Sequence, residues 1–416
     1  LFKLDNDTQE FKNIHIKSNE IRDALGPYFV SIKQAPDNKY WVGTLGGIIV
    51  CKSLEDIGKG DFEWHYSVLT DQTSLVDNLV STLYFDPTGI LWIGTEDGLD
   101  KYDPNKNHFI FNKDISKFIG GKAPRIRGFA KTYDNKIIAA TRHNGLFIKE
   151  NEKFVPLLNM QKDVSSIYTD DGQIFYCGLW NGKVWVYNYL NNQSREINVG
   201  FTQVPISAIK KINDHEIVIG SFGNGVNKFV LDGFSNFTNK SVLMDVGNIH
   251  KIITDSLNNI WFATQDGVVR HNPASETDTI YSSHINKNEG LPHNNVSDII
   301  FDKSGKLWAA TRSGLSYFDQ AKNTFVPTTI YGQLGNKWTT DLLLDSVGSL
   351  WLNVNNNTVA RINPITDAYS IFSVNSGNRL DYFSSHGFYS SGKSNTYIAG
   401  KNGVLYFSPD NMRDNR

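Results

Sequence analysis

Cysteine, net charge and long apolar runs are all scarce in this chain. Its 416 residues include two cysteines, and 41 Lys and Arg residues nearly cancel 43 Asp and Glu residues, which leaves a net charge of −2. The sequence shows no basic stripe, so we do not expect nucleic acid as a partner. No apolar run reaches the roughly 18 residues that a membrane-spanning helix needs.

Catalytic signatures are also missing. The sequence contains no His-Glu-x-x-His, no Gly-x-Ser-x-Gly, no phosphate-binding Gly-Lys-Ser/Thr loop and no Cys/His spacing typical of a metal site. We therefore expect no catalytic residue, no metal and no cofactor. A pair of carboxylates that meets only in the folded chain stays open, because a glycosidase needs no more than that.

What the sequence does contain is one short phrase, repeated nine times. The clearest copies are LWIGTEDGL at 91–99 and LWAATRSGL at 307–315. Looser copies are anchored on Gly43, Ala140, Gly178, Gly220, Ala263, Asn353 and Ala399. With Gly94 and Ala310 included, consecutive anchors lie 51, 46, 38, 42, 43, 47, 43 and 46 residues apart. A period of about 40–50 residues that holds several short strands is typical of a β-propeller.

The repeat around Trp308 shows how one blade is built. Its turn at 302–305 begins with Asp and ends with Gly, which is typical of a tight turn, and similar turns recur at 86–89 and 345–348. The expected strands cover 296–301, 307–311, 315–319 and 324–326. Four antiparallel strands joined by hairpins form one propeller blade.

Five tryptophans recur at one position of the phrase, and we expect them in the core: Trp41, Trp92, Trp261, Trp308 and Trp351. Strands covered on both faces by neighbouring blades explain why the residues around them are apolar in succession rather than alternating. Gly or Ala at the fourth position of the phrase fits a close approach between blades.

Cys51 and Cys177 lie in or beside strand-like segments of different repeats. We expect two buried thiols rather than a disulfide. The chain begins without Met or a signal peptide, and we expect it to be a processed or excised piece of a longer protein.

Nine phrases permit two ways of closing the fold. In the first, residues 120–416 form a seven-bladed ring, closed by a strand near 108–111, and residues 1–119 are the last blades of a preceding propeller. In the second, all nine repeats form one nine-bladed ring, in which the N-terminal strand completes the last blade. We favour the first interpretation, and both give an all-β propeller of four-stranded antiparallel blades.

The phrase Leu-Trp-Ile-Gly-Thr-x-x-Gly-Leu, preceded by Asp-x-x-Gly, resembles the two-component regulator propeller repeat. The segment 397–409 is similar to the last blade of the second propeller in that family. The resemblance covers nearly the whole chain and implies the periplasmic sensor region of a Bacteroidetes hybrid two-component system. In that family, such a region recognises an oligosaccharide and relays occupancy to a cytoplasmic histidine kinase.

The resemblance also implies partners within the same protein. These are an adjacent propeller, a β-sandwich domain and a transmembrane helix that provides the only membrane attachment. We further expect a homodimer of the full-length protein. The blades anchored on Asn353 and Gly178 depart from the phrase, because the first has lost its Gly-Thr core and the second its Thr.

Ligand contacts are expected on the ring face that carries both the turns between second and third strands and the connections between blades. A carbohydrate site needs an aromatic plane for the apolar face of the sugar and a few convergent polar groups for its hydroxyls. Trp180 and Trp338 suit this role because neither occupies the core position. The full set of candidates is Trp180, Trp338, Arg142, His143, Phe222, Arg312, Arg127, His293, Tyr382 and His386.

Three classes of function stay open on the sequence alone. A carbohydrate sensor is favoured, and a protein-docking or assembly scaffold is the alternative. A propeller polysaccharide lyase or glycosidase is a third class. Turnover of a glycan would indicate the enzyme, binding without turnover would indicate the sensor, and an apolar docking patch would indicate the scaffold.

Overall fold

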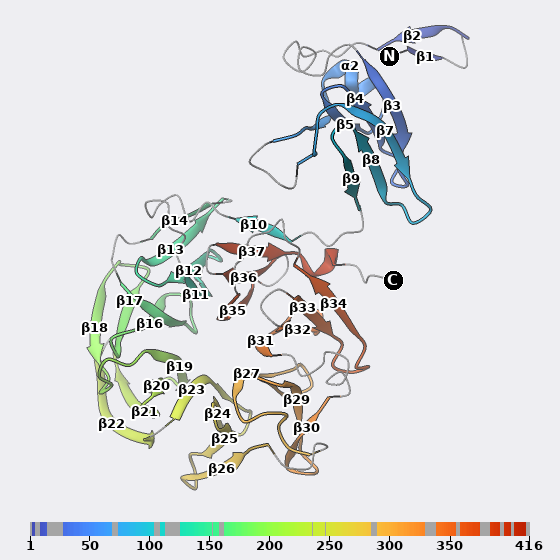
Figure 1. Cartoon of the computed structure of the whole chain (residues 1–416). Helices are drawn as coiled ribbons and strands as arrows, with labels where there is room; N and C mark the ends of the chain where they lie inside the picture. The colour runs from blue at the N-terminus through green and yellow to red at the C-terminus, as the bar shows by residue number, and fades with distance from the viewer. Residues whose placement is uncertain are drawn as a thin grey trace. The chain divides into compact units, whose positions relative to one another are not determined.

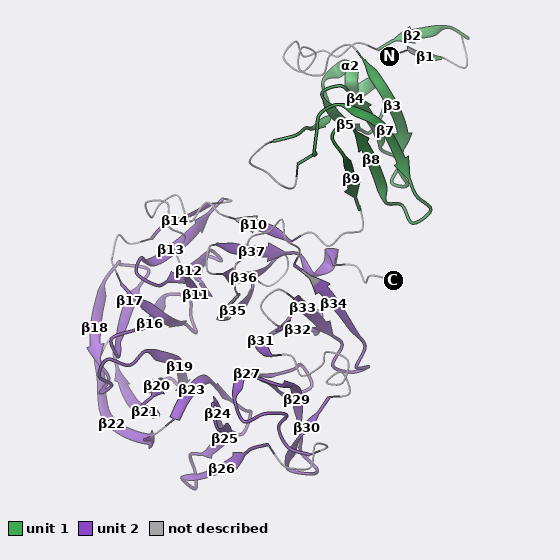
Figure 2. Ribbon diagram, in the orientation of Figure 1, with its two compact units in different colours: residues 1–107 green, residues 108–416 purple. Residues whose placement is uncertain are grey.

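The computed structural model divides the chain into two compact units, Leu1–Asn107 (unit 1) and His108–Arg416 (unit 2), coloured separately in Figure 2. Each unit is described by itself. The structure describes residues 2–4, 9–14, 28–68, 74–103, 109–112, 125–151, 153–157, 162–234, 236–245, 247–283, 289–328, 338–354, 358–374, 383–391, 395–400 and 403–412.

Unit 1 holds a hairpin and two neighbouring blades (Figure 1). The hairpin pairs β1 with β2, the first blade has the strand order β3-β4-β5-β6, and the second has β7-β8-β9. Its elements are β1 (Phe2–Leu4), β2 (Phe11–Asn13), β3 (Phe29–Gln34), β4 (Tyr40–Thr44), β5 (Gly47–Cys51), α2 (Glu55–Lys59), β6 (Glu63–His65), β7 (Val80–Phe85), β8 (Leu91–Thr95) and β9 (Leu99–Tyr102).

Unit 2 begins with β10 (Ile110–Asn112) and continues as a ring of four-stranded antiparallel blades (Figure 1). The first blade consists of β11 (Ile126–Lys131), β12 (Ile137–Thr141), β13 (Gly145–Glu150) and β14 (Lys153–Pro156). The second consists of β15 (Val164–Tyr168), β16 (Ile174–Leu179), β17 (Lys183–Asn188) and β18 (Ser194–Asn198). The third consists of β19 (Ile206–Asn213), β20 (Glu216–Gly223), β21 (Val226–Asp232) and β22 (Asn236–Met244).

The remaining blades have the same antiparallel arrangement of consecutive strands. The fourth consists of β23 (Gly247–Thr254), β24 (Ile260–Thr264), β25 (Gly267–Asn272) and β26 (Thr277–Tyr281). The fifth consists of β27 (Val296–Phe301), β28 (Leu307–Thr311), β29 (Gly314–Asp319) and β30 (Thr324–Pro327). The sixth consists of β31 (Thr339–Leu344), β32 (Leu350–Val354), β33 (Thr358–Ile362) and β34 (Tyr369–Ser373). The seventh holds β35 (Phe383–Ser390), β36 (Thr396–Gly400) and β37 (Val404–Phe407), followed by the short helix η2 (Pro409–Asn411).

The ring of unit 2 closes on itself with β10. This strand supplies the outer edge of the seventh blade by pairing antiparallel with β37, with Ile110 opposite Tyr406. The inner strands contact one another in turn around the ring, and the last of them, β35, contacts the first, β11. A seven-bladed ring is therefore complete within unit 2, and the alternative of one nine-bladed ring is wrong. The units divide at 107/108 rather than at 119/120 because β10 belongs to the ring.

The core of unit 2 lies between the blades rather than inside any one of them. Each of the seven blade interfaces has its own cluster of buried apolar residues, including the interface between the seventh blade and the first. Of the five repeated tryptophans, Trp41, Trp261, Trp308 and Trp351 are buried, whereas Trp92 in unit 1 is half-buried. Cys51 and Cys177 are buried free thiols, as expected.

The residues of the repeated phrase form the same local hydrogen bonds in several blades. The Thr hydroxyl donates to a Gly carbonyl across the following turn, as Thr311 does to Gly314 at 2.8 Å. The Asp that opens the preceding turn accepts the indole N–H of the core tryptophan, as Asp302 does from Trp308 at 2.8 Å. The same Asp–Trp bond joins Asp86 to Trp92, Asp255 to Trp261 and Asp345 to Trp351. Local polar chemistry thus fixes each blade while its apolar faces pack against the neighbours.

Glycine at the fourth position of the phrase lies where two blades nearly touch. A Cβ atom on Gly178 would stand 2.7 Å from the side chain of Ile206 in the next blade, and one on Gly220 would stand 2.7 Å from Ile249. Both distances are shorter than a normal contact, so only glycine fits there without a shift. The close approach expected from the sequence is therefore present between the second, third and fourth blades.

Candidate functional site

In five blades, a repeated backbone hydrogen bond places the turn between the second and third strands beside the start of the inner strand. In the first blade the amide of Arg142 donates to the carbonyl of Arg125 at 2.8 Å, and in the second the amide of Trp180 donates to Asp163 at 3.0 Å. Phe222, Gln265 and Arg312 make the equivalent bond in the third, fourth and fifth blades. These five residues therefore occupy equivalent positions on one face of the ring, as the sequence predicts.

A bulge near the start of the inner strands brings a second row of side chains to the same region. The extra residue is Arg127 in β11, His250 in β23, and a serine in each of β15, β19 and β27. A bulge leaves its extra residue outside the regular pairing and re-aims its side chain, which is why bulges often lie at functional sites. Ser165 and His250 use this freedom to bond the first carbonyl of the next inner strand, each at 2.7 Å.

Trp180 is the centre of a cluster of cationic and aromatic side chains on this face. The guanidinium of Arg142, from the turn between β12 and β13, lies 4.2 Å from the centre of the Trp180 ring. The guanidinium of Arg127, from the bulge of β11, lies 5.2 Å from it. The first and second blades therefore meet through two cation–π contacts. We call Arg127, Arg142 and Trp180 the Trp180 cluster.

The Trp180 cluster is rich in hydrogen-bond donors that have no acceptor. Arg127 Nε, Arg142 Nε and Trp180 Nε1 are buried atoms without a hydrogen-bond partner among the described residues. Burial lowers the pKa of the Arg127 guanidinium, and the charges of Arg142 and Arg125 lower it further. A guanidinium nevertheless stays charged, and it has no acceptor of its own. The cluster is consequently positive and offers donors only.

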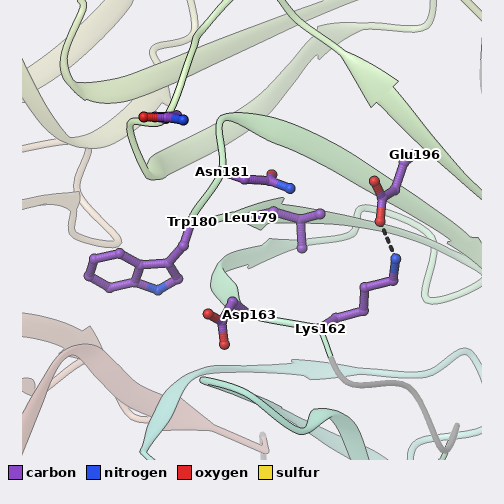
Figure 3. Close-up of a pocket in the computed structure, with 7 residues that line it drawn as sticks. Lys162, Asp163, Leu179, Trp180, Asn181 and Glu196 are labelled. Atoms are coloured by element: carbon purple, nitrogen blue, oxygen red, sulfur yellow. Dashed lines mark hydrogen bonds and ion pairs between the residues drawn. The ribbon is translucent and has the colours of Figure 1, made fainter.

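A pocket of about 470 Å³ adjoins Trp180, and Figure 3 shows the residues around it. Asp163, Leu179 and Asn181 line it beside Trp180, and Lys162 forms an ion pair with Glu196. Glu196 also lies 3.4 Å from the ammonium of Lys183. The hydrogen bond from Lys162 lowers the pKa of Glu196, although burial opposes the shift.

The interface between the third and fourth blades carries a second aromatic contact. Phe222 lies with its ring centre 5.9 Å from that of His250. His250 donates from Nδ1 to the carbonyl of Val296, and its burial lowers its pKa. Phe222 is about one-third exposed at 36%, so it offers an apolar plane one blade beyond Trp180. The third and fourth blades are joined here, because Phe222 pairs with Asn248 between β20 and β23.

The other predicted residues do not belong to the Trp180 cluster. His143 turns to an ion pair with Asp163, and His293 accepts the amide of Asn295 at Nδ1. Arg312 belongs to the fifth blade and Trp338 precedes the sixth, so neither shares a blade with the Trp180 cluster. Trp338 is 45% exposed. Tyr382 lies outside the described residues, and His386 lies in β35 with its side chain outside the description.

Several residues of this region are not among those predicted from the sequence. Asp163, Lys162 and Glu196 line the pocket, and His250 supports Phe222. His250 had one readable signal, because it occupies the same bulge position as Arg127 in the aligned repeats. Glu196 lies on the outer strand β18, where nothing in the repeated phrase points to a ligand.

The described residues contain no group of three or more His, Cys, Asp or Glu side chains that could hold a metal ion. Within the same ranges, no helix has the length and hydropathy that crossing a membrane requires. The fold and the ring face define a seven-bladed β-propeller with a loop-built candidate site.

The repeat recognised in the sequence is confirmed by comparison. Residues 74–97 in unit 1 and 290–313 in unit 2 match the two component regulator propeller family. No curated protein matches the chain.

Solved structures of similar fold include extracellular domains of two-component systems. One, from a hybrid two component system of B. thetaiotaomicron, has 20% sequence identity and a TM-score of 0.69, with 98% of this chain and 54% of that chain covered. A second from the same organism has 15% identity and a TM-score of 0.57, with 97% and 54% covered. The chain thus spans about half the length of these structures.

A third similar structure is an enzyme, a catalytically inactive virginiamycin B lyase from Staphylococcus aureus with quinupristin. It has 11% identity and a TM-score of 0.57, with 72% of this chain and 98% of that chain covered. All three likenesses are too distant in sequence to show more than the propeller fold.

Proposed function

We propose that this chain is the periplasmic ligand-sensing segment of a hybrid two-component system. Its ring binds an oligosaccharide at the Trp180 cluster, and occupancy is relayed to a cytoplasmic histidine kinase that controls genes of glycan use. The family match and the fold shared with extracellular domains of such systems support a sensing role. The segment itself binds without turnover, and kinase activity resides in another part of the protein.

The observation that carries this proposal is the Trp180 cluster. A sugar ring has an apolar C–H face and a rim of hydroxyl groups, so it suits an aromatic plane with donors at its edge. Trp180 supplies that plane, and the guanidinium groups of Arg127 and Arg142, which lie over the ring at 5.2 and 4.2 Å from its centre, supply the donors. The plane and the donors come from loops and a bulge on a rigid ring, where binding residues concentrate.

Binding is tested by calorimetric titration with a panel of plant, algal and host oligosaccharides, followed by chromatography of the recovered sugar. We expect one glycan class to bind and to be recovered unchanged. At 100 times its dissociation constant the ligand should stabilise the chain by about 2.7 kcal/mol. Trp180→Ala should weaken binding by about 30-fold or more, as expected for a central aromatic anchor.

Trp338→Ala is the matched control for this experiment, because it removes a tryptophan that is 45% exposed and outside the Trp180 cluster. Its affinity should match that of the unchanged chain. Equal losses in the two variants would contradict the placement of the site. A cleaved sugar would indicate the enzyme, and no binding by any glycan would favour the scaffold.

The relay requires that the ligand bind two arrangements of the sensor region with different affinities. A closed ring of packed blades leaves little room for change within a blade. We propose that the parts of the region reorient instead, either the propellers or the protomers of a homodimer. Solution scattering of the complete region should therefore change when ligand is added, and identical profiles would contradict this mechanism.

A further inference from the structure

In the part of the chain that the structure describes, no carboxylate forms an ion pair with the guanidinium groups of the Trp180 cluster. Of the two carboxylates that line the adjoining pocket, Glu196 pairs with Lys162 and Lys183, and Asp163 contacts His143, which forms an ion pair only when its imidazole is protonated. The charged groups that act on Arg127 are two further cations, Arg142 and Arg125. Among the described residues, neither Arg127 nor Arg142 has a carboxylate within ion-pair distance.

The unpartnered atoms of the cluster itself share one polarity, although Asp163 Oδ1, which lines the adjoining pocket, is also a buried atom without a hydrogen bond among the described residues. Arg127 Nε, Arg142 Nε and Trp180 Nε1 are all donors, and none of these three side chains can accept a hydrogen bond. A purely structural cation–π stack would carry the same charges, but it would not require three buried donors from two blades to go without acceptors. Each unsatisfied buried donor costs stability, so such a set needs a physical reason.

We propose that the Trp180 cluster binds a saccharide through an anionic group, a carboxylate or a sulfate ester, which the guanidinium groups of Arg127 and Arg142 hold. The inference rests on the proposed function, because it specifies the ligand of that same site. The oxygens of either anion are pure acceptors, and a guanidinium matches them with paired N–H donors. The indole N–H of Trp180, over whose ring both guanidinium groups lie, is a third donor without an acceptor among the described residues.

The test compares neutral and acidic oligosaccharides of equal length and linkage. Trimers of galactose, glucose and mannose are titrated beside their uronic acid and 6-sulfated counterparts, at low and at high salt. One acidic trimer should bind about tenfold or more tighter than its neutral counterpart, as expected for a charge-assisted hydrogen bond. Salt should reduce the preference, because it screens charge on a partly exposed face. The uronate and sulfate arms identify which anion is bound.

Arg142→Gln should bring the acidic and neutral affinities close together, because it should lower the acidic affinity much more than the neutral one. Arg142→Lys keeps the charge but loses the planar fork, and should restore part of the preference. Arg312→Gln is the matched control: Arg312 has the equivalent turn position, but two blades separate its blade from those of the Trp180 cluster in either direction around the ring. Its acidic preference should equal that of the unchanged chain, and thermal unfolding verifies that each variant is folded.

The outcomes separate the inference from the proposed function. Equal binding of neutral and acidic trimers would overturn the anionic ligand but leave the oligosaccharide sensor in place. An acidic preference that survives Arg142→Gln would also overturn the inference, because the anion would then lie elsewhere. Binding of no trimer at millimolar concentration would overturn both.

Discussion

Replacing Trp308 with alanine should lower the free energy of unfolding of the ring by about 3–5 kcal/mol. Trp308 is fully buried between the fifth and sixth blades, where it packs in one cluster with Leu342 and Leu352. The substitution leaves a cavity and also removes the indole N–H that Asp302 accepts at 2.8 Å. Asp302 is 8% exposed, so its carboxylate loses a partner that water replaces poorly. Urea unfolding followed by tryptophan fluorescence measures the effect.

Trp338→Ala provides the comparison, because Trp338 is 45% exposed and does not occupy the repeated core position. Its loss should cost less than about 1 kcal/mol, as surface substitutions usually do. Asp302→Ala alone should destabilise the ring, and the double variant should lose less than the sum of the two single losses, because the pair shares one hydrogen bond. Similar losses for the two tryptophans, or strict additivity of Asp302 and Trp308, would contradict this account of the core.

The repeated phrase made the blades predictable because its chemistry is local. Thr311 forms a hydrogen bond with Gly314 three residues away, and Asp302 forms one with Trp308 six residues away. Both interactions join residues of one short segment, so the sequence pattern can predict them. The number of blades in the ring needed one long-range fact, the pairing of β10 with β37. A closing strand near 108–111 was expected from the open last blade, and the structure contains it. The boundary between the two units lies at 107/108, rather than at the expected 119/120, because that strand belongs to the ring.

Only part of the Trp180 cluster could be predicted from the sequence. Trp180 and Arg142 follow from their turn position in the repeat, and the ring brings consecutive turns together. The direction of the Arg127 side chain depends on a bulge in β11, and nothing in the repeated phrase marks that bulge. The pairing of His143 with Asp163 depends on side-chain direction, which the sequence does not carry.

Equivalent positions in the repeat also predict candidate residues that do not lie together in the ring. Arg312 shares the turn position of Arg142, but a seven-bladed ring sets their blades far apart around its circumference. Position in the repeat therefore selects a face of the propeller, whereas the number of intervening blades selects the sector of that face. A ligand of a few sugar units contacts one sector, which is why the candidates divide into the Trp180 cluster and residues outside it.

Phe109→Ala should loosen the closure of the ring and cost about 3–4 kcal/mol of stability. Phe109 is 7% exposed, and its ring centre lies 5.2 Å from that of Phe407 in β37. It belongs to the cluster that joins the sixth and seventh blades, together with Trp351 and Phe372. Because β10 pairs through three residues only, this buried side chain should supply much of its attachment. Hydrogen exchange of the β37 amides should accelerate together with the loss of unfolding free energy.

Ile110→Ala tests the same strand without the same anchor. Ile110 pairs with Tyr406 but is 49% exposed, so its truncation removes little buried surface and should cost less than about 1 kcal/mol. The β37 amides should stay protected in that variant. Equal effects at the two neighbouring positions would mean that backbone pairing, rather than the packing of Phe109, holds the ring closed. A closed ring is what keeps the Trp180 cluster rigid, so ligand affinity should fall with Phe109→Ala and persist with Ile110→Ala.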